Sequence, residues 1–195
     1  MANKGLLVVI SSPSGGGKST IIRRIISEGD PRYRYSISAT TRAMRCGEKD
    51  GVDYWFVDEA EFKKMIGRDE LAEYEQVHGH FYGTPIRPIE KWLQEECIVF
   101  FDIDVKGAFA IQHLFPAETL MIFIAPPDLE TLRQRLIGRG TEASEAVRIR
   151  LERVSMEMEM GKAFEFTVIN RDLSRSAARV KKIITSRLAE RGAGV

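Results

Sequence analysis

The chain has 195 residues, 44% of them hydrophobic and 29% charged, which is enough apolar material for one buried core and argues for a globular protein over a disordered one. Its 29 basic and 28 acidic residues leave a formal net charge of +1, which argues against nucleic acid or a membrane surface as a partner, since both need a sustained positive excess. The two cysteines, Cys46 and Cys97, have no metal-like spacing and cannot build a disulfide framework, so we expect reduced thiols in a cytoplasmic protein. The first apolar run, residues 6–10, is too short for a signal peptide or a membrane span.

Apolar runs and helical patterns follow one another along the chain. The runs are continuous, which is typical of strands covered by helices on both faces of a sheet. We expect strands at residues 6–10, 97–104, 120–125 and 166–170. Apolar residues at helical spacing predict helices at residues 18–28, 128–137, 144–162 and 172–190. This order predicts an α/β fold with a three-layer core and a mainly parallel sheet.

Residues 35–88 break this order. Short β-like pieces such as "YSISATT" and "ELAEYEQV" dominate there, and the region is rich in Tyr, Arg, Glu and Gly. We therefore expect a small β-rich subdomain inserted into the α/β core. The sequence shows no internal repeat and no long linker.

Residues 12–19, "SPSGGGKS", nearly match the phosphate-binding loop G-x-x-x-x-G-K-[ST], with Ser12 at the first glycine position. Consecutive glycines let backbone N–H groups curl around a phosphate, toward which the following helix points its positive end. Lys18 can reach the β- and γ-phosphates, and the Ser19 hydroxyl can bind Mg²⁺. The alternative is a glycine-rich turn beside an unrelated lysine. The loop alone names no acceptor, because kinases, GTPases and motor ATPases all use it.

The inserted region offers a second anion site. Arg42 and Arg45 lie three residues apart, and Tyr54 follows them. Guanidinium groups bind phosphate through paired hydrogen bonds, and a tyrosine hydroxyl can add another. Taken alone, the arginine pair is more typical of a solvated surface turn.

A carboxylate beside hydroxyl donors in the same region suits guanine. Glu73 can accept from the guanine N1–H and N2 amino groups, while Ser38 and Thr84 can donate to O6. Adenine lacks these two donors and would leave buried partners unpaired, which predicts its rejection. An isolated glutamate is otherwise an ordinary solvated charge.

Two acids, Asp102 and Asp104, end an apolar run, and strand alternation places them on the same side. Ligands bind at the carboxyl ends of strands in open α/β sheets. We expect Asp102 to organise Mg²⁺ through water and Asp104 to face the acceptor, the alternative being a pair of turn acids. Further along, an arginine-rich segment in which Gly138 and Gly140 flank Arg139 predicts a lid that brings positive charge to a transferred phosphoryl group, the alternative being a helix with a solvated basic face. These arginines are Arg135, Arg139 and Arg150.

Together the motifs resemble those of the guanylate kinase family over nearly the whole chain. In order they are "PSGGGKST", "SATTRAMRCGEKDGVDY", "FYGT", "FFDID", "GRGTE" and "VIN", and the second is far more specific than the phosphate loop. The resemblance implies a phosphotransferase that moves the γ-phosphoryl group of ATP to GMP with Mg²⁺, giving ADP and GDP for purine nucleotide supply. It implies one domain over residues 1–195, made of a core at residues 1–34, 89–134 and 163–195, a GMP-binding insertion at 35–88 and a lid at 135–162.

The resemblance also assigns roles to residues. The residues it places with ATP are Ser14, Gly15, Gly16, Gly17, Lys18, Ser19, Thr20 and Asn170, the last beside the base. The residues it places with GMP are Ser38, Arg42, Arg45, Tyr54, Glu73, Tyr82, Thr84 and Asp104. Around the transferred phosphate it places Lys18, Arg42, Arg135, Arg139 and Arg150. Glu48 belongs to the same motifs without a clear role.

Three positions depart from the family pattern. Ser12 replaces a glycine, Lys106 stands where glutamine is common, and Arg171 follows Asn170 where an acid is common. Of these, Lys106 adds a positive charge near the expected acceptor site, which leaves its effect on turnover open.

Three other functional classes share part of the pattern. A different nucleoside monophosphate or small-molecule kinase would lack the block "TTRAMRCGEKDGVDY", and a switch GTPase would need an N-K-x-D-type motif, which the sequence does not contain. A non-catalytic interaction module of the same fold typically lacks the intact phosphate loop that this chain keeps. Neither the use of dGMP nor the choice between monomer and homo-oligomer follows from the sequence.

Overall fold

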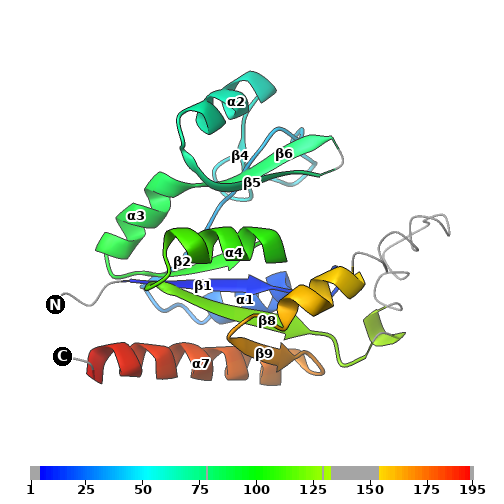
Figure 1. Cartoon of the computed structure of the whole chain (residues 1–195), viewed down its shortest axis with the longest axis vertical. Coiled ribbons are helices and arrows are strands. Elements are labelled where there is room, and N and C mark those ends of the chain that lie inside the picture. Colours follow the sequence, from blue (N-terminus) through cyan, green and yellow to red (C-terminus); the bar gives the residue numbers. More distant parts are fainter. Residues whose placement is uncertain (1–4, 78, 129, 133–153, 194–195) are drawn as a thin grey trace.

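The computed structural model describes residues 5–77, 79–128, 130–132 and 154–193, and it centres on a five-stranded sheet (Figure 1). The strands run parallel in the order β2-β7-β1-β8-β9. Their bounds are Leu6–Ser11 for β1, Tyr33–Tyr35 for β2, Ile98–Asp102 for β7, Thr119–Ala125 for β8 and Phe166–Ile169 for β9. The predicted α/β class with a mainly parallel sheet is confirmed.

Helices cover both faces of this sheet (Figure 1). One face packs against α1 (Lys18–Ile26) and α7 (Leu173–Ala193). The other packs against α3 (Ile86–Gln94), α4 (Val105–Leu114) and the helical residues 154–161. Within the described ranges, no helix has both the length and the apolar composition that crossing a bilayer requires.

The strand β1 shows why the apolar runs in the sequence are unbroken. Leu6, Val8 and Ile10 enter the core on the α1 and α7 face, whereas Leu7 and Val9 enter the core on the α3 and α4 face. All five side chains are fully buried. A strand with two buried faces cannot alternate between apolar and polar residues, so its sequence reads as a continuous hydrophobic segment.

A second sheet of four strands, in the order β4-β3-β6-β5, lies beyond α4 from the central sheet (Figure 1). Its strands are β3 (Ala39–Thr40), β4 (Trp55–Phe56), β5 (Leu71–Val77) and β6 (His80–Pro85). β3 pairs parallel with β4 and antiparallel with β6, and β5 and β6 form an antiparallel pair. All four come from the region that the sequence marked as β-rich.

One helix, α2 (Glu59–Gly67), packs on this second sheet. The Asp58 side chain caps α2 by accepting from the Glu61 N–H group at 2.7 Å. Phe62 is fully buried and stacks on Phe81 of β6, with ring centroids 5.3 Å apart. This aromatic pair fastens α2 to the sheet.

Some elements differ from the sequence-based expectation. The helices α2, α3 and α4 were not expected. α2 buries only Phe62, which leaves a weak signal in the sequence. α3 and α4 do carry apolar residues at helical spacing that pack into the core, and sequence reasoning missed this pattern. α1 ends at Ile26, before the expected end at residue 28. Most of the helix expected at residues 128–137, and part of that expected at 144–162, lies outside the described residues.

Replacing Phe62 by alanine should destabilise the second sheet, because a fully buried aromatic ring and its stacking partner are lost. We expect the free energy of unfolding to fall by about 3 kcal/mol or more. Denaturant titration followed by circular dichroism measures this. Val52→Ala, at a side chain that is 61% exposed in the same region, serves as the control and should change stability by less than about 0.5 kcal/mol.

Candidate active site

The glycine-rich loop between β1 and α1 has the backbone that its glycines permit. Gly15 and Gly17 have positive φ angles of 82° and 92°, and Gly17 is the residue before the first turn of α1. A Cβ atom on Gly16 would lie 2.7 Å from the Cβ of Ser12, so the loop folds back tightly on its own start. Ser12 is buried, and its hydroxyl donates to the Pro13 carbonyl at 3.0 Å. The serine at the first glycine position therefore fits the loop.

Lys18, at the start of α1, forms an ion pair with Asp102 at the end of β7, with 2.7 Å between Nζ and Oδ1. The register of the central sheet causes this meeting, because Ile10 of β1 lies directly opposite Asp102. The Asp102 side chain is only 12% exposed, and an ion pair of this kind offsets the cost of burying its charge.

Tyr35, at the end of β2, adds a third group beside Asp102. Burial raises the pKa of its phenol, and the Asp102 charge raises it further. Sequence reasoning missed Tyr35, because nothing in the local pattern indicated that the edge strand β2 would end beside β7.

Asn170, directly after β9, is hydrogen-bonded through its side chain to the glycine-rich loop. Its Nδ2 donates to the Gly16 carbonyl at 2.8 Å, and its Oδ1 accepts from the Ser176 hydroxyl at 3.1 Å. A Cβ on Gly17 would approach Asn170 Nδ2 to 2.5 Å. The close approach of this amide is thus a second reason for glycine at position 17.

Glu157, on the helical residues 154–161, also reaches the loop. It is only 5% exposed, and its carboxylate accepts from the Ser14 N–H group at 3.4 Å. The two residues are 143 positions apart in the sequence. No local motif could have indicated this contact, and sequence reasoning missed it.

A cavity of about 180 Å³ lies beside this loop, between the second sheet and the ends of the central strands. Its lining combines carboxylates, hydroxyls and a few apolar groups, which suits a polar ligand with several hydrogen-bonding edges. The lining residues are Ser38, Tyr54, Glu73, Glu75, Val77, Tyr82, Asp102, Ile103 and Asp104. Glu75, Val77 and Ile103 were not expected from the sequence, although Glu75 and Val77 follow Glu73 at the two-residue spacing that places side chains on one face of a strand.

Glu73 and Thr84 lie opposite each other on β5 and β6, and the Thr84 hydroxyl donates to Glu73 Oε1 at 2.5 Å. The pKa of the Glu73 carboxyl is raised to about 7. Burial is the largest cause, the charges of Asp104 and Glu75 add to it, and the hydrogen bond from Thr84 acts in the opposite direction. Gly107 of α4 lies close by, since a Cβ there would come within 3.2 Å of Glu73 Oε2. The second sheet and α4 therefore meet at this carboxylate.

Arg42 is held in place by Glu48. Its Nη2 pairs with Glu48 Oε1 at 2.8 Å, while Glu48 Oε2 accepts from the Arg45 N–H group at 2.8 Å. The guanidinium carbon lies 5.3 Å from the centroid of the Tyr54 ring, and only 10% of the Arg42 side chain is exposed. The hydrogen bond from Arg42 lowers the pKa of Glu48. The structure thus gives Glu48 a positioning role that the sequence left open.

A sequence model of a known family, described as guanylate kinase, matches residues 4–187. The chain belongs to the guanylate kinase family. A guanylate kinase of Bacillus cereus is 44% identical over 183 residues, which cover 94% of this chain and 89% of the relative. One of Streptococcus pneumoniae is 40% identical, with 94% and 88% covered. A crystal structure of guanylate kinase from Anaplasma phagocytophilum superposes with a TM-score of 0.78 at 30% identity, covering 96% of this chain and 88% of that one.

The structure brings together many of the residues that the guanylate kinase resemblance named. Lys18 and the loop glycines lie on one side of Asp102, and the cavity with Glu73 lies on the other. Asp104 caps α4 by accepting from the Gly107 N–H group at 2.9 Å. The side chain of Arg45 lies at an exposed position of the second sheet's loop. Outside the described residues lie the three expected lid arginines, Arg135, Arg139 and Arg150.

Replacing Glu73 by glutamine should stabilise this guanylate kinase family member in a pH-dependent way. Glu73 has a folded-state pKa of about 7 against an ordinary value of 4.5, so its ionisation in the folded chain opposes folding as the pH rises through about 7. We expect Glu73→Gln to match the unchanged chain near pH 4.5 and to exceed its free energy of unfolding by roughly 3 kcal/mol above pH 8. Urea unfolding at several pH values tests this, and a difference that does not vary with pH would contradict it.

Proposed function

We propose that the protein transfers the γ-phosphoryl group of ATP to GMP, as an ATP:GMP phosphotransferase that supplies GDP. The single observation that carries the proposal is the position of Asp102, which pairs with Lys18 of the phosphate loop and also lines the neighbouring cavity. A donor held by the loop and an acceptor held in the cavity would therefore lie next to each other. Membership in the guanylate kinase family supports this assignment of substrates.

On the donor side, the N–H groups of the loop and the N-terminus of α1 provide the site for the triphosphate of ATP. The residues we assign to it are Ser14, Gly15, Gly16, Gly17, Lys18, Ser19 and Thr20. Lys18 would exchange its ion pair with Asp102 for the β- and γ-phosphates. Asn170 holds the loop through its hydrogen bond to the Gly16 carbonyl, and its contact with the adenine base stays a prediction.

The residues present fit Mg²⁺ as the partner of ATP. Ser19 and Asp102 offer the oxygen ligands that Mg²⁺ prefers. The described residues hold no group of three or more His, Cys, Asp or Glu side chains suited to a metal, so the ion would take its other ligands from phosphates and water. When bound, Mg²⁺ neutralises the charge that develops on the phosphate oxygens. Ser19 would hold it directly and Asp102 through water.

On the acceptor side, the cavity offers a guanine end and a phosphate end. Glu73 would accept from guanine N1–H and N2, with Ser38 at O6 and Asp104 nearby. Thr84, whose hydroxyl donates to Glu73 Oε1 in this structure, would turn its hydroxyl to donate to O6. The phosphate end would consist of Arg42, Arg45, Tyr54 and Tyr82. The partly buried pair of Arg42 and Glu48 supports this role, because it presents a guanidinium whose orientation is already set.

Catalysis then depends on position and charge. The phosphate of GMP is an oxygen nucleophile that needs no general base, and the two anions must be brought in line against their repulsion. Lys18, Arg42 and the lid arginines Arg135, Arg139 and Arg150 would supply the positive charge that offsets it. In this scheme residues 35–88 bind GMP, residues 135–162 close over the nucleotides, and the remainder carries the phosphate loop.

We assign the enzyme to the cytoplasm. The free thiol of Cys46 is exposed and Cys97 is buried, which suits a reducing compartment. A non-catalytic interaction module is the competing function. The intact loop, in which Lys18 pairs with Asp102, favours the enzyme, because a module that only binds a protein partner does not need a phosphate-binding loop.

Replacing Lys18 by alanine should lower kcat by roughly 10³-fold, because the cation that follows the transferred phosphate is lost. A coupled assay of ADP release at saturating ATP and GMP measures it. Lys63→Ala, at an exposed lysine on α2, removes the same charge elsewhere and should leave kcat unchanged. A loss of less than about tenfold in Lys18→Ala would contradict the role of Lys18.

Replacing Glu73 by alanine should raise KM for GMP and relax the rejection of AMP, because the acceptor for N1–H and N2 is removed. The same assay, run with GMP, AMP, UMP and dTMP in turn, gives the ratios of kcat/KM. Glu95→Ala, at an exposed glutamate beyond the end of α3, is the matched control. Unchanged kinetics with GMP would remove Glu73 from the acceptor site.

A further inference from the structure

A second cavity, of about 350 Å³, lies on the other side of the Glu73 carboxylate, between β5 and α4. Three carboxylates, those of Glu73, Glu75 and Asp104, line both this cavity and the acceptor cavity described above. Among the described residues that line the two cavities, Lys106 is the one that carries a positive charge. Lys18 neutralises Asp102 from outside the lining, so Lys106 is the cation that lines a cavity together with Glu73, Glu75 and Asp104.

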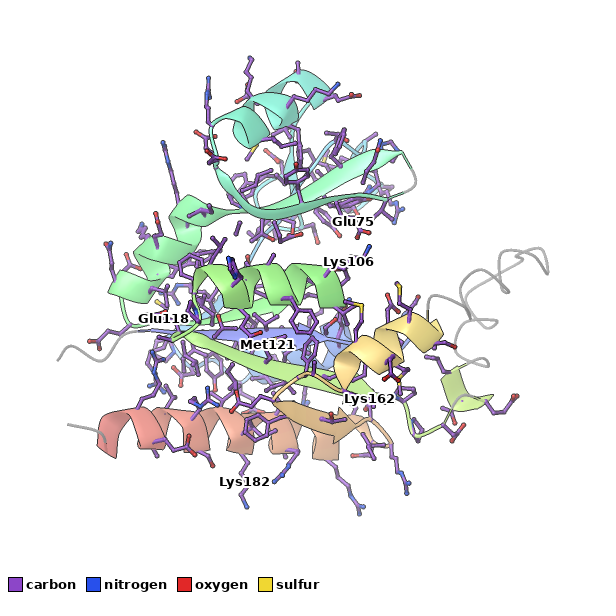
Figure 2. The ribbon with its side chains drawn as sticks, viewed as in Figure 1. Glu75, Lys106, Glu118, Met121, Lys162 and Lys182 are labelled. Carbon is purple, nitrogen blue, oxygen red and sulfur yellow. The ribbon has the colours of Figure 1, made fainter. Side chains whose placement is uncertain are left out.

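Lys106 stands at an unusual place for a lysine. It is the second residue of α4, whose N-cap is Asp104, and a positive charge in the first turn of a helix is repelled by the helix dipole. Figure 2 shows its side chain extending from α4 toward β5, where the Glu75 side chain extends toward α4. The carboxylates of Glu73, Glu75 and Asp104 line the same cavity, so negative charge lies near this unfavourably placed lysine.

Glu75 links this charge to the recognition of the acceptor. It lies two residues from Glu73 on the same face of β5, and its charge is one of the causes that raise the pKa of Glu73, after burial and Asp104. A carboxylate that accepts from N1–H and N2 of guanine must be ionised, because a protonated one presents a donor where an acceptor is needed. Whatever offsets the charge of Glu75 therefore favours the binding form of Glu73.

We propose that Lys106 is a positioning residue for acceptor recognition: it faces Glu75 across the cavity, offsets the charge of that carboxylate, and so keeps Glu73 in the ionised form that binds guanine. The inference rests on the proposed role of Glu73 as the guanine acceptor. Other titratable groups also face Glu73 from the elements packed around it. Together they set the pKa of Glu73 that the charge of Lys106 then shifts. The titratable groups concerned are Tyr54, Glu75, Tyr82, Asp102, Asp104 and Lys106.

The first test is the pH profile of kcat/KM for GMP in low salt, for the unchanged chain and for Lys106→Gln. The midpoint of the acidic limb should rise by roughly half a pH unit in Lys106→Gln, which lowers kcat/KM two- to threefold near pH 6.5. At pH 8.5, kcat at saturating GMP should match that of the unchanged chain. The titration of the GMP phosphate is common to both proteins, so a difference between their profiles belongs to the protein.

Salt and a matched variant exclude a general effect of charge. About 0.5 M salt should bring the two profiles together, since partly exposed charges are screened over a few ångströms. Lys182→Gln removes the same charge from α7, on the opposite side of the central sheet, where its side chain points into solvent (Figure 2). Its profile should coincide with that of the unchanged chain. An unmoved midpoint in Lys106→Gln, or an equal shift in Lys182→Gln, would overturn the proposal.

Two further variants separate the route through Glu75 from the role of Glu73. Glu75→Gln should lower the midpoint, because the charge of Glu75 is one of the causes that raise the pKa of Glu73, so the two substitutions should shift the midpoint in opposite directions. A midpoint that Glu75→Gln leaves unmoved would contradict the route through Glu75. Glu73→Gln removes the carboxyl that titrates, so its pH profile of kcat/KM should lose the acidic limb that belongs to the protein and keep only the titration of the GMP phosphate. If it keeps that limb, Glu73 is not the guanine acceptor and the inference fails with the proposed function; if it loses the limb while Lys106→Gln does nothing, the inference alone fails.

Discussion

The pairing of β1 with β7 is the constraint on which the site depends. With Ile10 opposite Asp102, the phosphate loop leaves β1 beside the carboxyl end of β7, and Lys18 reaches Asp102 at 2.7 Å. A shift of one residue in this register would turn Asp102 to the other face of the sheet, because side chains alternate along a strand. The parallel sheet thus determines that the loop and the neighbouring cavity share one carboxylate.

In the proposed function, the second sheet contributes acceptor recognition through burial. Its hairpin places Glu73 opposite Thr84 and against α4, where desolvation raises the pKa of the carboxyl to about 7. Such a group opposes folding in its ionised form, yet a poorly solvated carboxylate discriminates strongly between ligands that can and cannot donate to it. With Glu73 as the proposed guanine acceptor, stability would be exchanged for selectivity at this position, as is common where binding sites are built from buried polar groups.

The phosphate loop itself is maintained by residues far from it in the chain. The Asn170 side chain donates to the Gly16 carbonyl, and the Glu157 carboxylate accepts from the Ser14 N–H group. An added Cβ would meet Ser12 at position 16 and Asn170 at position 17, so close packing requires glycine at both positions. At position 17 the positive φ angle is a second reason. The loop is therefore positioned by tertiary contacts and not by its own sequence alone.

The sequence by itself determined the class of fold, the family and the identity of most polar groups in the site, because unbroken apolar runs, the glycine-rich loop and the block from Thr41 to Tyr54 are local patterns. It did not reveal α2, which buries one side chain and leaves a weak periodicity, and the helical spacing of the apolar residues in α3 and α4 was missed beside the β-like pieces around them. Only the tertiary structure decided that Tyr35 lies beside Asp102, that Glu48 orients Arg42 and that Glu75 and Lys106 line one cavity. These relations depend on distances between segments that are separate in the chain, and the free energy that fixes them comes from packing the two sheets with their helices, which no short stretch of sequence encodes.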